Sequence, residues 1–394
     1  MENLKKVNCN DILTILKYLI ALVISLPAKL FVPKNMWLIS ERGDEARDNA
    51  YHLFKYIRTM HLNKNCYFLI KKNCKDYEKV RQYGNIIEYG SIKHFVYYIL
   101  SKVCISTHIY RYIPDDRVVS RLDKLFHLKK IRVFLQHGVI KDSHPYLASD
   151  IIDLDLFCCS AQRECDFIKK SLRYTDDVAI CTGLARYDNL LNYEEKDYIL
   201  LMPTWRGDLY QLSDDEFVKS DYYLAFQKIL TSKKLKKVLD EENMKLIFYP
   251  HYEMQKFIHL FKSNCNNILI AEHEKFDVQQ LLKESKLLIT DYSSVFFDFA
   301  YMKKPLLYYQ FDKDIYFKRH YAKGYFDYER DGFGEIVMEE NVVSSIIKYL
   351  YDLTMPEKYI HRVDSFFRYR DQKNCERIFN EIEKKCVKNG RVKK

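Results

Sequence analysis

The segment formed by residues 286–312 constrains the fold more than any other part of this chain. Residues 287–289 are an apolar run with the length of a buried parallel strand. Apolar side chains then recur at three- and four-residue steps over residues 295–302, which predicts a helix. Pro305 ends that helix, and residues 306–309 have the pattern of the next strand. The order strand, turn, helix, strand is typical of a parallel α/β sheet.

The turn between the first strand and the helix contains two hydroxyl side chains, Ser293 and Ser294. The start of a helix presents free backbone N–H groups and the positive end of the helix dipole, which suits a phosphate. Serine is also a common helix cap. The turn by itself is therefore compatible with a phosphate site and with ordinary capping.

The rest of the chain continues the alternation of strands and helices. Short apolar runs predict strands at residues 36–40, 66–70, 86–89, 103–107, 132–136, 156–160, 178–181, 198–202, 245–249 and 268–271. A chain of 394 residues exceeds one typical hydrophobic core. We expect two doubly wound, Rossmann-like domains that face each other across a cleft, formed by residues 34–192 and 193–394.

The N-terminal segment, residues 1–33, is predicted to associate with a membrane. Its apolar stretch, residues 12–32, has an uncharged core at 18–28, which is shorter than the roughly 20 residues that span a bilayer. Lys5, Lys6, Lys29 and Lys34 flank the apolar stretch. We favour a helix that lies in the membrane interface with its lysines outward. A helix packed on the protein is the alternative, and the lack of a small-residue cleavage site disfavours a signal peptide.

Charge and cysteine content limit the class of partner and the compartment. The net charge of +10 indicates an anionic partner, such as a membrane surface or a nucleotide-activated substrate. Nucleic acid is disfavoured, because the chain lacks zinc-finger spacing and RNP-like aromatic motifs. The eleven cysteines include no C-x-x-C pair, which is typical of reduced thiols in a cytosolic protein. The sequence contains no cluster with metal-ligand spacing.

Polar candidates follow several predicted strands at the point where each strand ends. They are His137, Thr204, Arg206, His251, Ser293 and Ser294. Open α/β sheets bind ligands in the crevice beyond the carboxyl ends of their strands. We therefore expect these side chains to lie near one another.

The chemistry of these residues favours transfer to or from a phosphate. Histidine accepts a proton near neutral pH, and Gly138 would let a substrate or a backbone approach His137 closely. His251, Arg206 and the serine turn together resemble a clamp for a polyanion. The chain has no G-x-G-x-x-G and no Walker A sequence, which disfavours Rossmann cofactors and P-loop chemistry.

Four motifs occur in order along the chain: LQHGVIKD (135–142), MPTWRGD (202–208), YPHYEM (249–254) and ITDYSSVFFDFAYMKKPLLYYQFD (289–312), preceded by WLISERGDEARDNAYHLFKYIR (37–58). Together they resemble the CDP-glycerol glycerophosphotransferase family, the primases and polymerases of wall teichoic acid and related capsule polymers. The resemblance implies a GT-B-like fold, a monotopic hold on the cytoplasmic face of the cell membrane, and no required metal or other cofactor. CDP-glycerol would be the donor substrate.

The resemblance also implies roles for individual residues. His137 occupies the position of the catalytic base. His251, Ser293, Ser294 and Asp298 match donor positions, with Thr204 and Arg206 beside them. Glu41 and Arg42 would lie near the acceptor. Asp291 has two interpretations, a position near the acceptor and a structural role in holding the turn.

The activity implied is transfer of glycerol phosphate to a hydroxyl of a polyprenyl-diphosphate-linked acceptor, with release of CMP. The motifs leave primase and polymerase open, and they fit CDP-ribitol as an alternative donor. A GT-B glycosyltransferase that uses a nucleotide sugar would share the two halves. A membrane-bound assembly subunit without catalysis is the alternative of a different class.

Overall fold

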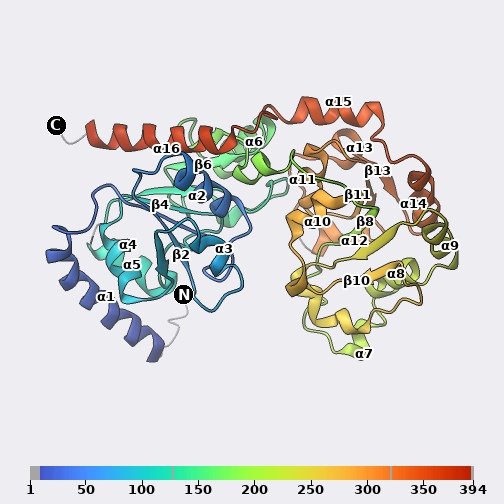
Figure 1. The fold of residues 1–394 in the computed structure, drawn as a ribbon, viewed down its shortest axis with the longest axis horizontal. Coiled ribbons are helices and arrows are strands. Elements are labelled where there is room, and N and C mark those ends of the chain that lie inside the picture. Colours follow the sequence, from blue (N-terminus) through green and yellow to red (C-terminus); the bar gives the residue numbers. More distant parts are fainter. Residues whose placement is uncertain (1–8, 127, 320–321, 392–394) are drawn as a thin grey trace.

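The computed structural model describes residues 9–126, 128–319 and 322–391, and it contains two α/β halves side by side (Figure 1). Each half has one sheet in which every neighbouring pair of strands is parallel. The GT-B-like architecture of two doubly wound domains is confirmed.

The first half is built on a seven-stranded sheet with the order β3-β2-β1-β4-β5-β6-β7. Its strands are β1 (Trp37–Ser40), β2 (Cys66–Ile70), β3 (Ile86–Glu88), β4 (Val103–Ser106), β5 (Ile131–Phe134), β6 (Leu156–Cys159) and β7 (Ala179–Cys181). Its helices are α1 (Cys9–Ala28), α2 (Asn49–Met60), α3 (Tyr77–Arg81), α4 (Ile92–Leu100), α5 (Asp116–Phe126), η1 (Pro145–Leu147), α6 (Gln162–Leu172) and η2 (Ala185–Asn189).

The second half has a six-stranded sheet with the order β10-β9-β8-β11-β12-β13. Its strands are β8 (Tyr198–Leu201), β9 (Lys245–Phe248), β10 (Ile268–Ile270), β11 (Ser285–Thr290), β12 (Leu306–Tyr309) and β13 (Glu335–Val337). Its helices are α7 (Asp214–Phe217), α8 (Asp221–Leu230), α9 (Lys233–Glu241), η3 (Tyr252–Leu260), η4 (His273–Lys275), α10 (Val278–Glu284), α11 (Val295–Tyr301), α12 (Lys313–Arg319), α13 (Tyr328–Asp331), α14 (Val342–Tyr351) and α15 (Glu357–Phe366).

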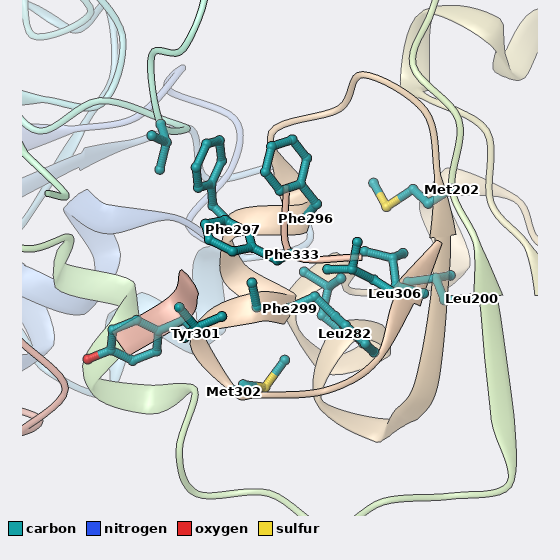
Figure 2. Close-up of a cluster of buried hydrophobic side chains, with 14 of the residues drawn as sticks. Leu200, Met202, Leu282, Phe296, Phe297, Phe299, Tyr301, Met302, Leu306 and Phe333 are labelled. Carbon is teal, nitrogen blue, oxygen red and sulfur yellow. The ribbon is translucent and has the colours of Figure 1, made fainter. Parts of the chain in front are cut away.

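The segment around β11 forms the elements that its sequence predicts. Leu288 packs into a core cluster on one face of the sheet, whereas Leu287 and Ile289 pack into a cluster on the other face. Because helices cover both faces, these strands are continuously apolar rather than alternating. Phe296 and Phe299 of α11 are buried in the first of these clusters, and this packing fixes the start of the helix beside β11 (Figure 2).

The last helix, α16 (Asn374–Arg391), does not belong to the second half, although the sequence analysis assigned residues 193–394 to one domain. It crosses back and packs on α2 and η2 of the first half (Figure 1). Phe379 lies in the first-half core with its ring centroid 5.4 Å from that of Trp37. The amphipathic pattern of a helix does not reveal which of two cores it covers, which explains the difference.

Helix α1 docks on the first half through its polar side. Thr14 donates a hydrogen bond to Asp115 at 3.1 Å, Tyr18 donates to Asp123 at 3.1 Å, and Asp11 pairs with Arg117. The opposite side is exposed and apolar, comprising Ile12, Leu13, Leu16, Leu19, Ile20, Val23, Ile24 and Leu26. By length and composition, α1 is the one helix among the described residues that qualifies as a candidate membrane span. The flanking Lys5 and Lys6 lie outside the described residues.

Candidate active site

The carboxyl ends of strands from both halves border one cleft. Two cavities of about 440 and 270 Å³ occupy it. Both are lined by His108, His137, His251, Ser293 and Ser294. Because the cavities share these side chains, they are two parts of one cleft. Histidines of the first half lie there across from a histidine and two serines of the second.

His137 lies in a tight turn directly after β5. Gln136 there has a φ of 61°, a left-handed conformation that few non-glycine residues adopt. The side-chain amide of Asn49 donates to the carbonyl oxygens of Leu135 and Gln136 at 3.3 and 2.8 Å. Arg186 donates to the carbonyl oxygen of His137 at 3.1 Å. These hydrogen bonds stabilise a strained turn that places His137 in the cleft wall.

The imidazole of His137 is exposed to the cleft, and the walls of the cleft surround it. Burial, reinforced by the positive charges of Arg42 and Arg186, lowers the pKa of His137 to about 4. The ring is therefore neutral at neutral pH. It is in the protonation state that a general base requires.

The ring of His108 stacks on that of His137, with 4.5 Å between centroids and 9° between planes. The guanidinium of Arg42 donates to Nε2 of His108 at 3.2 Å, which leaves Nδ1–H to donate to the hydroxyl of Thr107 at 3.0 Å. His108 is therefore a neutral ring held in a fixed tautomer beside His137. His108 is not among the residues predicted from the sequence, although it follows β4 in the same way that His137 follows β5 and the same rule applies to it.

The two halves touch at Gly138 and Ser294. A β-carbon on Gly138 would lie 2.5 Å from the hydroxyl oxygen of Ser294. The close approach predicted at Gly138 is made by the serine turn of the second half. A side chain at the position after His137 would therefore displace the Ser294 hydroxyl.

Ser293 and Ser294 lie at the start of α11, where both border the cleft. Ser294 holds the N-cap position, but its side chain makes no capping hydrogen bond. Ordinary capping, the alternative considered for this turn, is thus not what its hydroxyl does. The hydroxyl faces the cavity shared by the two halves.

Thr204 and His251 form the second-half wall of the larger cavity. The Thr204 hydroxyl is buried and has no hydrogen-bond partner within the described part of the chain. The His251 ring lies near that of Trp205, 6.2 Å between centroids, and its Nδ1 accepts from the Glu253 amide at 3.3 Å. A buried hydroxyl without a partner costs stability unless a ligand or water satisfies it, so Thr204, which borders the cleft, is a candidate contact for a ligand.

Comparison with known proteins identifies the family. The family described as CDP-Glycerol:Poly(glycerophosphate) glycerophosphotransferase matches residues 21–384. The chain belongs to this family.

The relatives with similar sequences are proteins of teichoic acid biosynthesis, and solved structures share the fold. The minor teichoic acid biosynthesis protein GgaB of Bacillus subtilis (strain 168) is 35% identical over 368 residues, which cover 90% of this chain and 40% of GgaB. A teichoic acid poly(glycerol phosphate) polymerase of Bacillus spizizenii is 36% identical over 157 residues, 39% of this chain and 36% of that protein. The chain thus spans about two-fifths of the length of these curated relatives. A solved structure of the wall teichoic acid polymerase TagF shares the fold, with a TM-score of 0.62 at 16% identity over 98% of this chain and 100% of that one.

Arg206, a predicted donor-binding residue of this glycerophosphotransferase-family chain, has a different environment from the one expected. Its guanidinium bonds to Asp291 at 2.9 Å and to Asp312 at 2.7 and 3.1 Å. These carboxylates, acting against burial, raise the pKa of Arg206 above its usual range. Arg206 lines a neighbouring cavity of about 280 Å³ instead of the cleft. The two carboxylates neutralise the positive charge of Arg206. These ion pairs also anchor the MPTWRGD motif (202–208).

Asp291 has the role in the turn that the sequence analysis gave as one of its two options. It is fully buried, and one oxygen accepts the amides of Thr204 at 2.8 Å and Tyr292 at 2.6 Å. The other oxygen pairs with Arg206. Asp291 therefore ties the loop after β8 to the turn after β11, and this sets the position of Thr204 in the cleft.

Asp298, expected at the donor, borders the smaller cavity with both carboxylate oxygens bonded to Arg186 at 2.6 and 2.8 Å. Glu41 lies at the same cavity and accepts the backbone amides of Arg47, Asp48 and Tyr51 at 2.8, 2.8 and 3.0 Å. Burial, with the Asp48 charge adding to it, raises the pKa of Glu41 to about 8. Glu41 thus holds the start of α2.

Arg42 spans the smaller cavity between the halves. Its guanidinium lies 5.3 Å from the ring centroid of Tyr252 in the second half and 3.3 Å from a carboxylate oxygen of Glu45. The acceptor role of Glu41 and Arg42 stays a prediction. Within residues 9–126, 128–319 and 322–391, no three His, Cys, Asp or Glu side chains group as metal ligands, and a reaction without a metal is likewise a prediction.

Proposed function

We propose that this chain transfers glycerol phosphate from CDP-glycerol to a hydroxyl of a polyprenyl-diphosphate-linked saccharide or polymer and releases CMP. The reaction would serve the synthesis of teichoic acid or a capsule-type polymer. The observation that carries the proposal is geometric: His137 borders the cleft directly before Gly138, where the first half approaches Ser294 of the second. A base and a phosphate site must face each other there for in-line transfer.

The acceptor oxygen attacks the β-phosphorus of CDP-glycerol. The new P–O bond makes a phosphodiester, and the bond between this phosphorus and the oxygen bridging to the α-phosphorus breaks to give CMP. The proton of the acceptor hydroxyl passes to His137 and then to solvent. The donor's negative charge would raise the pKa of His137 while it is bound, which favours this transfer.

The donor side is assigned to the second half. Ser293, Ser294, His251 and Thr204 would bind the pyrophosphate and the glycerol phosphate through hydrogen bonds. CMP leaves as a stable anion, so the step needs stabilisation of charge more than a strong acid. We propose that no metal or other cofactor takes part.

Helix α1 would hold the enzyme on the cytoplasmic face of the cell membrane as a peripheral, monotopic protein. Its apolar side faces away from the protein, while its polar side is bound to Asp115 and Asp123. A helix packed lengthwise on α4 and α5 lies along a surface rather than through a bilayer. An interfacial position would also bring the cleft to a lipid-linked acceptor.

The test is release of CMP by the full chain with a lipid-linked acceptor. CDP-glycerol, CDP-ribitol and UDP-sugars are compared, with His137→Ala as the control. We expect release from CDP-glycerol that depends on acceptor and on His137. Preference for CDP-ribitol would change the donor, transfer from a UDP-sugar would indicate a glycosyltransferase, and no turnover with any donor would favour an assembly subunit.

A further inference from the structure

Arg186 connects three parts of the cleft from a position just before the crossover into the second half. It lies in η2 and is 8% exposed. Its guanidinium donates to the Asp48 carboxylate at 2.7 Å, to the His137 carbonyl oxygen at 3.1 Å, and to both oxygens of Asp298 at 2.6 and 2.8 Å. These partners belong to the start of α2, the turn of His137, and α11.

The backbone of Arg186 is held as firmly as its side chain. Its amide donates to the side-chain oxygen of Asn49 at 3.0 Å, and the Asn49 amide group bonds to the carbonyl oxygens of Leu135 and Gln136. Its carbonyl oxygen accepts from Gln279 of the second half at 3.3 Å. The strained turn before His137 is therefore stabilised by Asn49 and Arg186 together.

We propose that Arg186 is a positioning residue, which fixes the distance between the turn of His137 and the start of α11. In terms of the proposed function, on which this inference rests, Arg186 keeps the base and the donor phosphate in register across the two halves. Asp298 then acts through Arg186 and not on the donor. Both Asp298 oxygens are occupied, and a carboxylate beside a pyrophosphate would repel it.

A second ion pair between the halves provides a matched control. Arg163 of α6 bonds to Asp331 of α13 at 3.1 and 3.0 Å, with the Arg163 side chain 42% exposed. It also links the two halves, but its arginine is partly exposed and neither residue lines the cleft. A role that is only structural would be shared by both pairs, whereas a positioning role belongs to Arg186 alone.

The first experiment is steady-state kinetics with CDP-glycerol for Asp298→Asn, Arg186→Lys and Arg163→Met. We expect Asp298→Asn to lower kcat by at least about tenfold with the donor KM changed by less than about threefold. Arg186→Lys keeps the charge but loses the two-pronged geometry, so kcat should fall similarly. Arg163→Met should keep kcat within about twofold. A raised donor KM with unchanged kcat in Asp298→Asn would show that Asp298 binds the donor directly and overturn the proposal.

The second experiment does not depend on activity. Hydrogen–deuterium exchange of residues 135–140 should become faster in Arg186→Lys and stay unchanged in Arg163→Met. If Arg186→Lys does not fold, the double variant Arg186→Met with Asp298→Asn removes both charges of the Arg186–Asp298 pair and is measured instead. Unchanged exchange would overturn the positioning role. An inactive wild-type enzyme would refute the proposed function while the exchange result still decides this one.

Discussion

Gly138 and Ser294 meet across the cleft at a distance that leaves no space for a β-carbon, which would lie 2.5 Å from the serine hydroxyl oxygen. Gly138 directly follows His137 in the first half, and Ser294 is the N-cap residue of α11 in the second. The contact therefore sets how closely the proposed base approaches the proposed phosphate site. It also makes that separation sensitive to a single methyl group.

We expect Gly138→Ala to lower the free energy of unfolding by about 1–3 kcal/mol, the usual cost of forcing an extra carbon into a packed site. CMP release should fall as well, because the Ser294 hydroxyl is displaced from its place at the cleft. Thermal denaturation of Gly138→Ala, Ser294→Ala and the double variant checks this. The next atom, the Ser294 β-carbon, is 3.4 Å from the added carbon, so the double variant should recover most of the lost stability. A double variant as unstable as Gly138→Ala would contradict the contact.

The pH dependence of catalysis follows from the pKa of His137. The base acts when neutral, and a pKa lowered to about 4 keeps it neutral above that pH. The acid limb of kcat/KM, which reports the free enzyme, should therefore lie below the ordinary histidine value of about 6.5. Bound donor raises the pKa, so the acid limb of kcat should lie at higher pH than that of kcat/KM.

His137→Ala supplies the control for these profiles. It should fold normally, lose at least about 10²-fold in turnover, and show neither acid limb. An acid limb that persists in His137→Ala would assign the titration to another group.

Thr204→Val separates ligand binding from stability. The Thr204 hydroxyl is buried without a protein partner in the described regions, so replacing it with a methyl should leave the melting temperature unchanged or raise it. The donor KM should rise if that hydroxyl binds CDP-glycerol. His251→Ala and Ser294→Ala, measured alongside, should also weaken donor use. Normal donor KM values in all three variants would remove the second-half wall from donor binding.

Much of the fold could be predicted from sequence because its strands are buried on both faces. Leu287 and Leu288 pack into different cores, so the run is apolar throughout and easy to recognise. The return of α16 could not be predicted in this way. Its contacts, such as that of Phe379 with Trp37, join residues at opposite ends of the chain. The local periodicity of a helix does not predict such long-range contacts.

Residues at strand ends could also be predicted to meet, and His137, His251, Ser293 and Ser294 do border one cleft. What each charged group does there depends on partners from other elements. Arg206 is neutralised by two carboxylates. These pairings arise only in the folded chain. A motif therefore identifies a loop at the cleft, but it does not show whether a side chain of that loop faces the ligand or pairs with another part of the protein.

The exposed face of α1 gives the last prediction. Leu16 and Val23 are 51% and 69% exposed, so glutamate at both positions should leave the fold intact. Burial of each side chain in lipid is worth about 1.5–3 kcal/mol, so the double variant should lose at least about tenfold in binding to anionic vesicles. Leu224→Glu, at a residue 54% exposed on α8, is the matched control and should bind like wild type.

Substitution tests the helix more cleanly than removing residues 1–33. The deletion would also expose the groups that bind the polar side of α1, including Asp115 and Asp123, and aggregation could follow from that alone. Vesicle co-sedimentation at low and high salt is the measurement, because the lysines at the end of α1 add a salt-sensitive attraction of about 1 kcal/mol each. Activity on a soluble acceptor analogue should persist in the double variant while activity on a lipid-linked acceptor in bilayers falls. If the double variant pellets as wild type does, the membrane contact lies elsewhere, and Leu125 and Phe126 at the end of α5 are the next exposed apolar residues beside α1 to replace.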